Sequence, residues 1–197
     1  MRLVLVRHAE AEESARGRCY GTLDVGLSPL GRAQCAALEA SLAEEPVAAV
    51  VSSPRVRALE TAGAIARPHG LHVVVDEGLR ELDFGELEGR TYDEIAGTLP
   101  DLYAAWMTTP TEVRFPGGES YADLKRRALA AVERLRSSHD GEAVVAVTHG
   151  GVVRAVVSDA LGMPAERIFR LAVDPASTSV VEWLDGEPLV RCLNAGL

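Results

Sequence analysis

The feature that most constrains the fold is a set of short runs of branched apolar residues that end in polar residues. Such runs occupy residues 3–6, 47–51 and 143–147, and a shorter one covers residues 71–75. Runs of this kind indicate strands that are buried on both faces, as in parallel sheets covered by helices. Amphipathic stretches separate them, the longest being residues 121–135. We therefore predict an α/β protein, a three-layer α/β/α sandwich with a mostly parallel central sheet.

The chain of 197 residues is long enough for one well-filled domain, which we assign to residues 1–197. Two serine–proline pairs, at residues 28–29 and 53–54, predict helix starts, because serine is a good N-cap and proline suits the first helical position. The second predicted helix places Arg57 in or beside its first turn.

Residues 78 to about 118 predict a lid inserted over one edge of the sheet. The segment reads as a loop, two short helices broken near Pro100, and a second loop. We expect it to be too short to bury a core of its own. From residue 168 onward apolar and polar residues alternate, which predicts two or three edge strands with a turn at residues 185–186.

Composition narrows the choice of partners. The net charge is −9, whereas nucleic acids and anionic membranes require a basic face, so we expect neither as a partner. The three cysteines form no CxxC pair, which suits a reducing cytosol better than a disulfide framework or a zinc site. We find no signal peptide and no apolar stretch of the roughly 20 residues that span a bilayer. We expect a cytoplasmic protein with a small-molecule partner, and we leave open whether it forms a homodimer.

Residues suited to anion chemistry follow three of the predicted strands. Arg7 and His8 close the first strand, Arg57 follows the second, and Thr-His-Gly-Gly at residues 148–151 closes the last of the runs. Ligands of open α/β sheets bind beyond the carboxyl ends of the strands. Arginine binds oxyanions in a bidentate manner, and the N–H groups at a helix start, here at Gly150, favour an anion.

Each of these residues also has a structural alternative when it is taken alone. Arg7 and His8 then read as a surface pair at a strand end, and His149 as a hydrogen-bonded structural histidine. Their convergence at one sheet edge favours an oxyanion site instead. Because the arginines would repel a cation, we expect no metal there.

These residues belong to a series of motifs that resembles the histidine phosphatase superfamily, which includes the cofactor-dependent phosphoglycerate mutases. The series covers nearly the whole chain in the same order, so it is far more specific than any single motif. The matching segments are residues 5–10, 21–24, 27–34, 52–62, 79–89, 117–120 and 147–151. The resemblance implies a phosphoglycerate mutase-like fold.

The resemblance also implies a role for each residue at the sheet edge. His8 matches the nucleophile that takes the phosphoryl group and becomes a phosphohistidine. Arg7, Arg57 and His149 match the pocket that holds the phosphate and stabilises the transition state, with Gly150 beside it. The physics agrees, because neighbouring arginines favour a neutral histidine and fixed cations suit charged phosphoryl oxygens. We expect no cofactor.

Glu81 matches the group that gives a proton to the leaving oxygen, which an alkoxide requires. Asp83, Glu86 and Glu88 are competing carboxylates of the same segment, and we interpret them as ordinary loop residues. We assign Glu119 to the start of the following helix, where acidic residues are common.

Two positions depart from the family pattern. Ala9 replaces the glycine that usually follows the histidine, which is a small change. Six residues after His8, where many members carry an asparagine that reaches the phosphate, this chain has Ser14, whose hydroxyl has a shorter reach. Thr22 is a further candidate for phosphate contact from the same loop.

Within the superfamily, residues 18–25 and 117–120 look most like the α-ribazole phosphatases of cobalamin assembly, although broad-range phosphatases share these motifs. Phosphoglycerate mutases carry a longer basic insertion, whereas the basic residues noted in this region are Arg80, Arg90 and Arg114. We therefore predict a metal-independent phosphomonoesterase of the histidine acid phosphatase type. Its substrate would be a small phosphorylated metabolite, for example α-ribazole 5′-phosphate. The alternatives are a cofactor-dependent phosphoglycerate mutase and an inactive phosphate-binding module.

Overall fold

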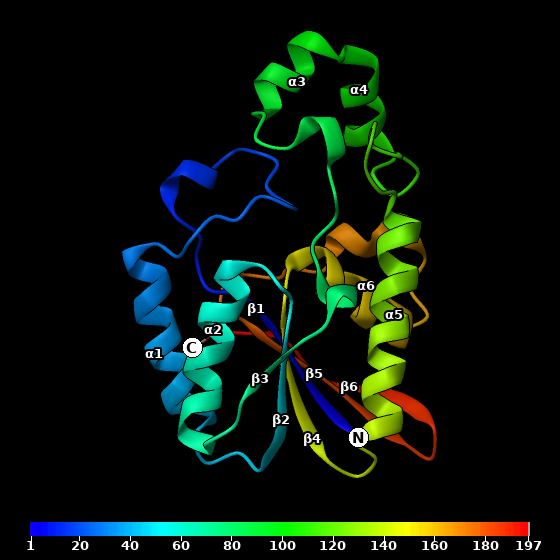
Figure 1. Cartoon of the computed structure of the whole chain (residues 1–197). Coiled ribbons are helices and arrows are strands. Elements are labelled where there is room, and N and C mark those ends of the chain that lie inside the picture. Colours follow the sequence, from blue (N-terminus) through cyan, green and yellow to red (C-terminus); the bar gives the residue numbers. More distant parts are fainter. Residues whose placement is uncertain (197) are drawn as a thin grey trace.

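The apolar runs form one six-stranded sheet in a computed structural model that describes residues 1–196 (Figure 1). The strands lie in the order β3-β2-β4-β1-β5-β6. The first four are parallel, whereas β5 is antiparallel to β1 and β6 to β5, so the predicted mostly parallel sheet is confirmed. The strands are β1 Arg2–Arg7, β2 Val47–Ser52, β3 Val73–Val75, β4 Ala143–Thr148, β5 Thr178–Leu184 and β6 Glu187–Ala195.

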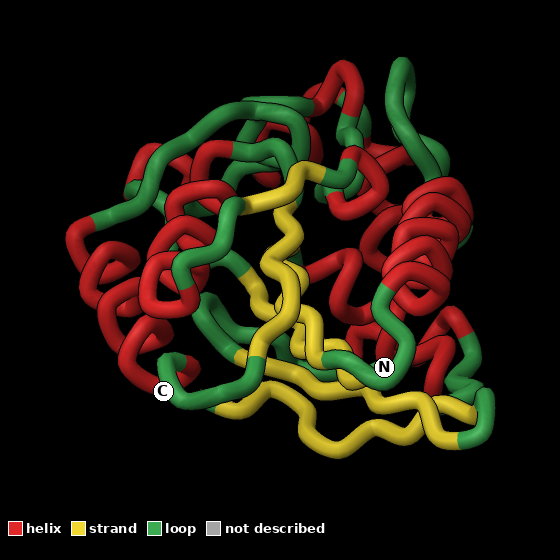
Figure 2. The backbone as a smooth tube through the Cα atoms, turned by 60° about the horizontal axis from the view of Figure 1, so that its bottom comes forward, coloured by secondary structure: helices red, strands yellow, loops and turns green. Residues whose placement is uncertain are grey.

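Two pairs of helices cover the two faces of the sheet (Figure 2). Helices α1 (Pro29–Leu42) and α2 (Val56–Ala66) bury their apolar faces against one side of β1, β2 and β4. Helices α5 (Tyr121–Ser138) and α6 (Gly150–Ala160) form a second core on the opposite side. Each fully buried Val or Leu of these cores contributes about 1.5–3 kcal/mol relative to exposure. This is the predicted α/β/α sandwich, with β1 inside it.

The two predicted helix starts have different outcomes. Ser28 caps α1 by accepting a hydrogen bond from the Gly31 N–H, as expected. Helix α2 begins two residues later than predicted, at Val56, with Arg55 as its N-cap. The Ser53 hydroxyl lies before the first turn of this helix, where it accepts from the Arg55 N–H at 3.4 Å and contacts His149 at the site described below.

The insertion contains the two expected short helices, α3 (Tyr92–Thr98) and α4 (Pro100–Thr108), at the top of Figure 1. Its apolar side chains pack in a small buried cluster, to which Cys19 from outside the insertion also contributes. Aromatic side chains bury a large area each, and the rings of Phe84, Trp106 and Phe115 pack 5.1–5.7 Å apart. The buried residues of this lid core are Cys19, Leu87, Ile95, Trp106, Val113 and Phe115.

The tail forms the strands β5 and β6, joined by a tight turn at the predicted position. Asp185 and Gly186 both have positive φ, as a two-residue hairpin turn requires. Short 3-10 helices complete the described chain. They are η1 Glu13–Ala15, η2 Arg67–His69, η3 Glu77–Leu79, η4 Gly85–Leu87 and η5 Ala165–Arg170.

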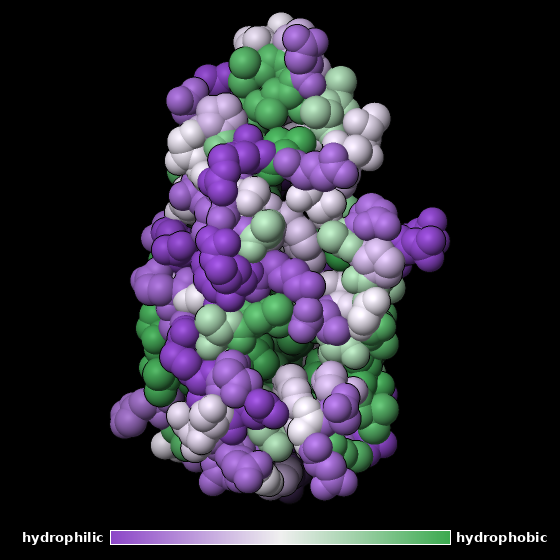
Figure 3. All heavy atoms as spheres, turned by 90° about the vertical axis from the view of Figure 1, so that its right-hand side faces the viewer, coloured by the Kyte–Doolittle hydropathy of each residue, from purple (hydrophilic) through white to green (hydrophobic). Residues whose placement is uncertain are grey.

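The outer surface on the α5 side is mixed in character. Hydrophilic residues cover much of the middle of this face, and apolar residues gather at the lid end, at the top of the view (Figure 3). Met107 and Tyr92 are among the exposed large apolar residues of the lid. Within residues 1–196, none of the helices combines the length and the apolar character needed to cross a membrane.

Candidate active site

The sheet brings the two predicted histidines together at its edge. Strands β1 and β4 are neighbours, with Arg7 opposite Thr148. The next residues in each chain segment, His8 and His149, therefore lie side by side, and their ring centroids are 5.0 Å apart. This separation is close to the spacing of about 4.8 Å between adjacent strands.

His8 is oriented by the backbone that follows it. Its side chain is buried, at 3% exposure, and its Nδ1 lies 2.7 Å from the Ala9 carbonyl oxygen. A carbonyl only accepts, so Nδ1 carries the hydrogen and Nε2 keeps a free lone pair. Burial, followed by the positive charge of Arg57, lowers the pKa of His8 to about 3. His8 is therefore a neutral ring with a fixed tautomer at pH 7.

His149 is fixed by two side chains. Its Nδ1 lies 3.3 Å from Arg57 Nη2, and because a guanidinium only donates, Nδ1 is the acceptor. Its Nε2 then carries the hydrogen and donates to Ser53 Oγ at 2.7 Å. Burial lowers the pKa of His149 well below its ordinary value, and His8 and Arg57 add to the effect. This histidine is neutral as well.

Arg57 is fully buried and holds the turn after η1 in place. Its Nη1 donates to the Leu23 carbonyl at 2.8 Å, and its Nη2 donates to the carbonyls of Tyr20 and Gly21 at 2.9 and 3.1 Å. The guanidinium also lies 5.0 Å from the Tyr20 ring centroid, within cation–π range. Backbone and aromatic contacts thus fix this cation beside the two histidines.

Arg7 is held in a similar way, because its Nη1 donates to the Val173 carbonyl at 2.6 Å. The Nε atoms of Arg7 and Arg57 are buried and lack a hydrogen-bond partner within the described residues. A buried donor without a partner is costly. Both charges act on the pKa of His8, so an oxyanion bound next to this ring would be well placed to accept from both arginines.

Glu81 reaches this edge from the insertion. One carboxylate oxygen accepts from the Leu82 N–H at 2.9 Å, and the other accepts from the Gly151 N–H, at the start of α6, at 3.2 Å. A Cβ atom at position 151 would lie 2.3 Å from Glu81 Oε1. The glycine therefore leaves the space that the carboxylate occupies. The charge of Glu81 also opposes the fall in the pKa of Arg57 that burial causes.

The three other predicted phosphate ligands are less central. Gly150 is buried at the start of α6, where a Cβ would lie 3.1 Å from Arg154 Nη1 and 3.8 Å from Arg7 Nε. Ser14 is exposed in η1 and is not part of the pocket lining. The Thr22 N–H donates to the Glu88 carboxylate at 2.9 Å. Phosphate contact by these three residues stays a prediction.

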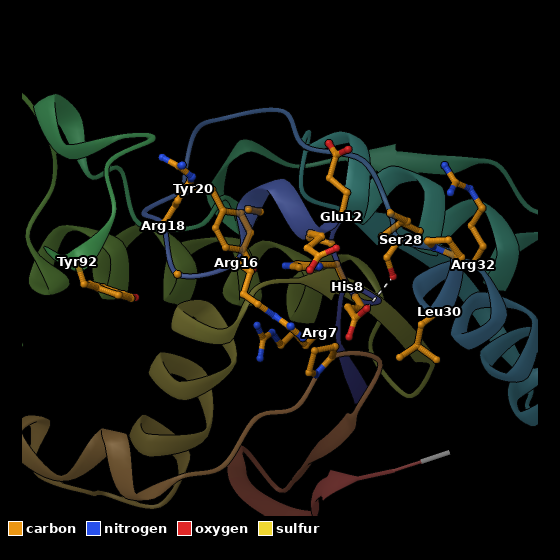
Figure 4. A pocket seen from close by; sticks show the side chains of 18 residues that line it. Arg7, His8, Glu12, Arg16, Arg18, Tyr20, Ser28, Leu30, Arg32 and Tyr92 are labelled. Carbon is orange, nitrogen blue, oxygen red and sulfur yellow. Dashed lines mark hydrogen bonds between the residues drawn. The ribbon is translucent and has the colours of Figure 1, made fainter. Parts of the chain in front are cut away.

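A pocket of about 800 Å³ opens beside His8 (Figure 4). Arg7 and His8 belong to its lining, whereas Arg57 and His149 are fully buried. Charged residues of both signs line the rest, including Glu12, Glu13, Arg16, Arg18 and Arg32, together with the aromatic rings of Tyr20 and Tyr92. A polar group attached to a bound anion would fit this lining.

Sequence reasoning missed several residues that shape the site. Ser53 orients His149, and its position just after β2 was a usable signal. Arg154 lies one helical turn after Gly150 on α6, so its spacing could have revealed it. Its Nε donates to the Leu171 carbonyl at 3.1 Å, and its Nη1 lies on the side of Gly150 that Arg7 approaches. Tyr20, under Arg57, had no clear signal in the sequence.

The protein is an α/β protein in which two neutral histidines and two arginines meet at the carboxyl edge of the sheet, an arrangement suited to binding an oxyanion. In residues 1–196 we find no group of three or more His, Cys, Asp or Glu side chains arranged to hold a metal ion.

The chain belongs to the histidine phosphatase superfamily (branch 1), whose family model matches residues 3–196. It is 38% identical over 195 residues to the bifunctional protein Rv2228c of Mycobacterium tuberculosis, covering 98% of this chain and 53% of that protein. The chain thus spans about half the length of this relative. It is 33% identical to phosphoserine phosphatase 1 of Hydrogenobacter thermophilus, covering 98% of this chain and 92% of that protein.

Solved structures share the fold over nearly their whole length. Bacillus stearothermophilus YhfR matches with a TM-score of 0.92 and 30% identity, over 96% of this chain and 95% of that one. The α-ribazole phosphatase from Shigella flexneri matches with a TM-score of 0.90 and 26% identity, over 99% and 96%. The resemblance predicted from the motifs is confirmed, and its neighbours include α-ribazole phosphatases.

Proposed function

We propose that this protein hydrolyses phosphomonoesters through a phosphohistidine formed at His8. The observation that carries the proposal is the hydrogen bond of 2.7 Å from His8 Nδ1 to the Ala9 carbonyl. It directs the lone pair of Nε2, on a buried neutral ring, into a site that two arginines make positive. A neutral nitrogen nucleophile beside fixed cations is suited to attack on a phosphate.

In the first step, Nε2 of His8 attacks phosphorus while the bond from phosphorus to the ester oxygen breaks. The leaving oxygen takes a proton from Glu81, so an alcohol departs and not an alkoxide. In the second step, water attacks phosphorus, the N–P bond breaks, and Glu81 takes the proton of the water. Arg7 and Arg57 stabilise the charge on the phosphoryl oxygens in both steps.

The substrate we propose is a small metabolite with a polar leaving group. The mixed charges of Glu12, Glu13, Arg16 and Arg18 along the pocket support a polar partner over an apolar one. α-Ribazole 5′-phosphate is one candidate, in view of the similar phosphatases. Cys19, Cys35 and Cys192 are free thiols, which suits the cytoplasmic location that we propose.

A hydrolysis screen tests this proposal. Purified protein is assayed with p-nitrophenyl phosphate, α-ribazole 5′-phosphate, phosphoserine and the phosphoglycerates, with and without EDTA. We expect turnover that EDTA leaves intact, because Arg7 and Arg57 supply the positive charge that a metal would otherwise provide. Loss of all activity in EDTA would contradict the metal-independent mechanism. Interconversion of phosphoglycerates that responds to 2,3-bisphosphoglycerate would identify a mutase, and binding without turnover an inactive module.

A further inference from the structure

We propose that Arg127, paired with Glu119, is a positioning residue that holds Glu81 at the leaving group of the substrate. The proposal rests on the proposed phosphatase function and adds a residue of α5 to it. Arg127 lies outside the pocket lining and is far from His8 in the sequence. Its effect would be exerted through the loop that carries Glu81.

Arg127 uses all five of its N–H donors. Its Nη1 donates to the carbonyls of Gly78 and Arg80 at 3.0 and 2.6 Å, and its Nη2 donates to the carbonyl of Glu81 at 2.8 Å. Its Nε and Nη2 also donate to the two carboxylate oxygens of Glu119, at 2.9 and 2.8 Å. Five donors in a planar fork match five acceptors, which no other side chain can do.

Glu119 is the second member of this group of contacts, and we call the pair of Arg127 and Glu119 the Arg127 clamp. Glu119 therefore does not serve the helix start to which we assigned it from the sequence. Ser120 and Asp123 cap α5 instead. Burial by itself would raise the pKa of Glu119, but the hydrogen bonds and charge of Arg127 outweigh it and lower this pKa. The ionised carboxylate also accepts from the Asp83 N–H at 3.2 Å. Both side chains are largely buried, at 15% and 18% exposure, so solvent weakens the pair less than it would at the surface.

The clamp leaves the loop little freedom. The one carbonyl between residues 78 and 81 that Arg127 does not hold, that of Leu79, accepts from Thr148 Oγ1 at 2.7 Å. Thr148 is the last residue of β4 and directly precedes His149. The loop is thus tied to α5 on one side and to the strand of the second histidine on the other. Gly78 lies so close to α5 that a Cβ would be 2.8 Å from that of Ala131.

Proton transfer to a leaving oxygen depends steeply on placement, and a shift of about 1 Å can cost on the order of 10²-fold in rate. A residue that only positions the acid should therefore affect those substrates that need the acid. Alkyl phosphates need it because an alkoxide leaves poorly. p-Nitrophenyl phosphate does not, because its phenolate leaves unaided. This difference separates positioning of Glu81 from general damage to the fold.

The test compares Arg127→Ala with Arg126→Ala on both kinds of substrate. Arg126 is the next residue of α5, and its side chain is 74% exposed and paired with Asp123, so its variant should keep the wild-type rates. Arg127→Ala should lose about 10²-fold in kcat on an alkyl phosphate and less than about tenfold on p-nitrophenyl phosphate. Arg127→Lys should recover little of the loss, because an ammonium cannot match the five acceptors.

A double-mutant cycle on the alkyl phosphate provides the second readout. If Arg127 acts through Glu81, adding Arg127→Ala to Glu81→Gln should cost almost nothing more. Equal losses on both substrates, or additive losses in the cycle, would overturn the proposal. Should Arg127→Ala fail to fold, Glu119→Gln carries the same test, because it weakens the same clamp. If the wild-type protein hydrolyses neither substrate, the proposed function fails instead.

Discussion

The sheet edge and the lid hold their functional groups in contrasting ways. At the sheet edge, His8, Arg57 and His149 are at most 3% exposed and are fixed by strand register, backbone carbonyls and the cores on both faces. In the lid, Glu81 is half-buried and belongs to a loop without regular structure. Its placement depends on the Arg127 clamp and on a separate small core.

The contrast suggests a division of chemical labour. In the proposed mechanism the sheet edge binds the phosphoryl group, which every phosphomonoester shares. The lid supplies Glu81, the proposed acid for the leaving group, and leaving groups differ from one substrate to the next. Changes at the sheet edge should thus affect all substrates alike, and changes in the lid should depend on the leaving group. The following predictions test this division.

Removing the nucleophile should have the largest effect. His8→Ala should lower the rate by on the order of 10⁵–10⁶-fold, as loss of a covalent nucleophile does in other hydrolases. The loss should be the same for alkyl and aryl phosphates, and the acid-labile phosphoenzyme should disappear from quenched labelling experiments. Substantial activity or labelling in this variant would place the nucleophile elsewhere.

Arg57→Ala should lose on the order of 10²–10³-fold in kcat, by analogy with removal of one fixed oxyanion donor. The factor should again be independent of the leaving group. Arg57→Lys should recover little, since lysine lacks the fork that holds the carbonyls of Tyr20 and Leu23. Near wild-type rates in the lysine variant would show that a point charge is enough.

Glu81→Gln should slow hydrolysis by a factor that depends on the leaving group. We expect a loss of about 10²-fold on alkyl phosphates, typical of a general acid, and a much smaller loss on p-nitrophenyl phosphate. Rates measured over a series of leaving groups would give a steeper dependence on leaving-group acidity than in the wild type. Equal losses would indicate a purely positioning role, and an unchanged alkyl rate would move the acid to Asp83 or Glu86.

Acid should weaken the sheet edge before it weakens the lid clamp. The pKa of His8 is about 3 in the native state and 6.5 in its ordinary state, so the unfolded chain binds the extra proton between these values. Stability is therefore lost as the pH falls below 6.5, by about 2 kcal/mol for His8 at pH 5. Glu119 has a lowered pKa, so its contribution is lost only below its ordinary value of 4.5.

Denaturant unfolding at pH 7, 6 and 5 measures this loss. His149 is also kept neutral by burial and should add to it. A free energy of unfolding that is flat from pH 7 to pH 5 would contradict the assignment of buried neutral histidines.

The smallest predicted effect is that of removing one methylene group from the sheet core and, separately, one from the lid core. Ile65 of α2 and Ile95 of α3 are both fully buried, and Ile→Val in a core costs about 1 kcal/mol. We expect Ile65→Val to lower the global free energy of unfolding by this amount. Ile95→Val should act mainly on local opening of the lid, seen as faster amide exchange in residues 85–115. Equal effects on global stability would show that lid and sheet unfold together.

Local sequence signals predicted much of the fold and the sheet-edge residues. The strands with apolar runs, the Ser28 cap and the break at Pro100 depend on neighbouring residues, which the sequence shows directly. Arg7, His8, Arg57 and His149 were found because parallel strands end at a common edge. The position of the site follows from the strand order, and the parallel strand order follows from the alternation of strands and helices.

What the sequence did not predict depends on contacts between distant segments. The role of Glu119 is decided by its contacts with Arg127 and Asp83. Ser53 contacts His149 and is not the N-cap of α2. The lid core includes Cys19 from another loop, a contact that the sequence of the insertion alone does not show. Ser14 was chosen by counting six residues from His8, and its contact with phosphate stays a prediction.

The pairing of β1 with β4 ties the chemistry to the completion of folding. His8 and His149 are far apart in the sequence, and their separation of 5.0 Å exists only when these strands are in register. Contacts between such distant segments close a long loop and form late. During refolding, recovery of phosphohistidine formation should thus follow the slowest phase of tertiary structure, however early the helices appear. Phosphohistidine formation would thus indicate that β1 and β4 have paired in the native register.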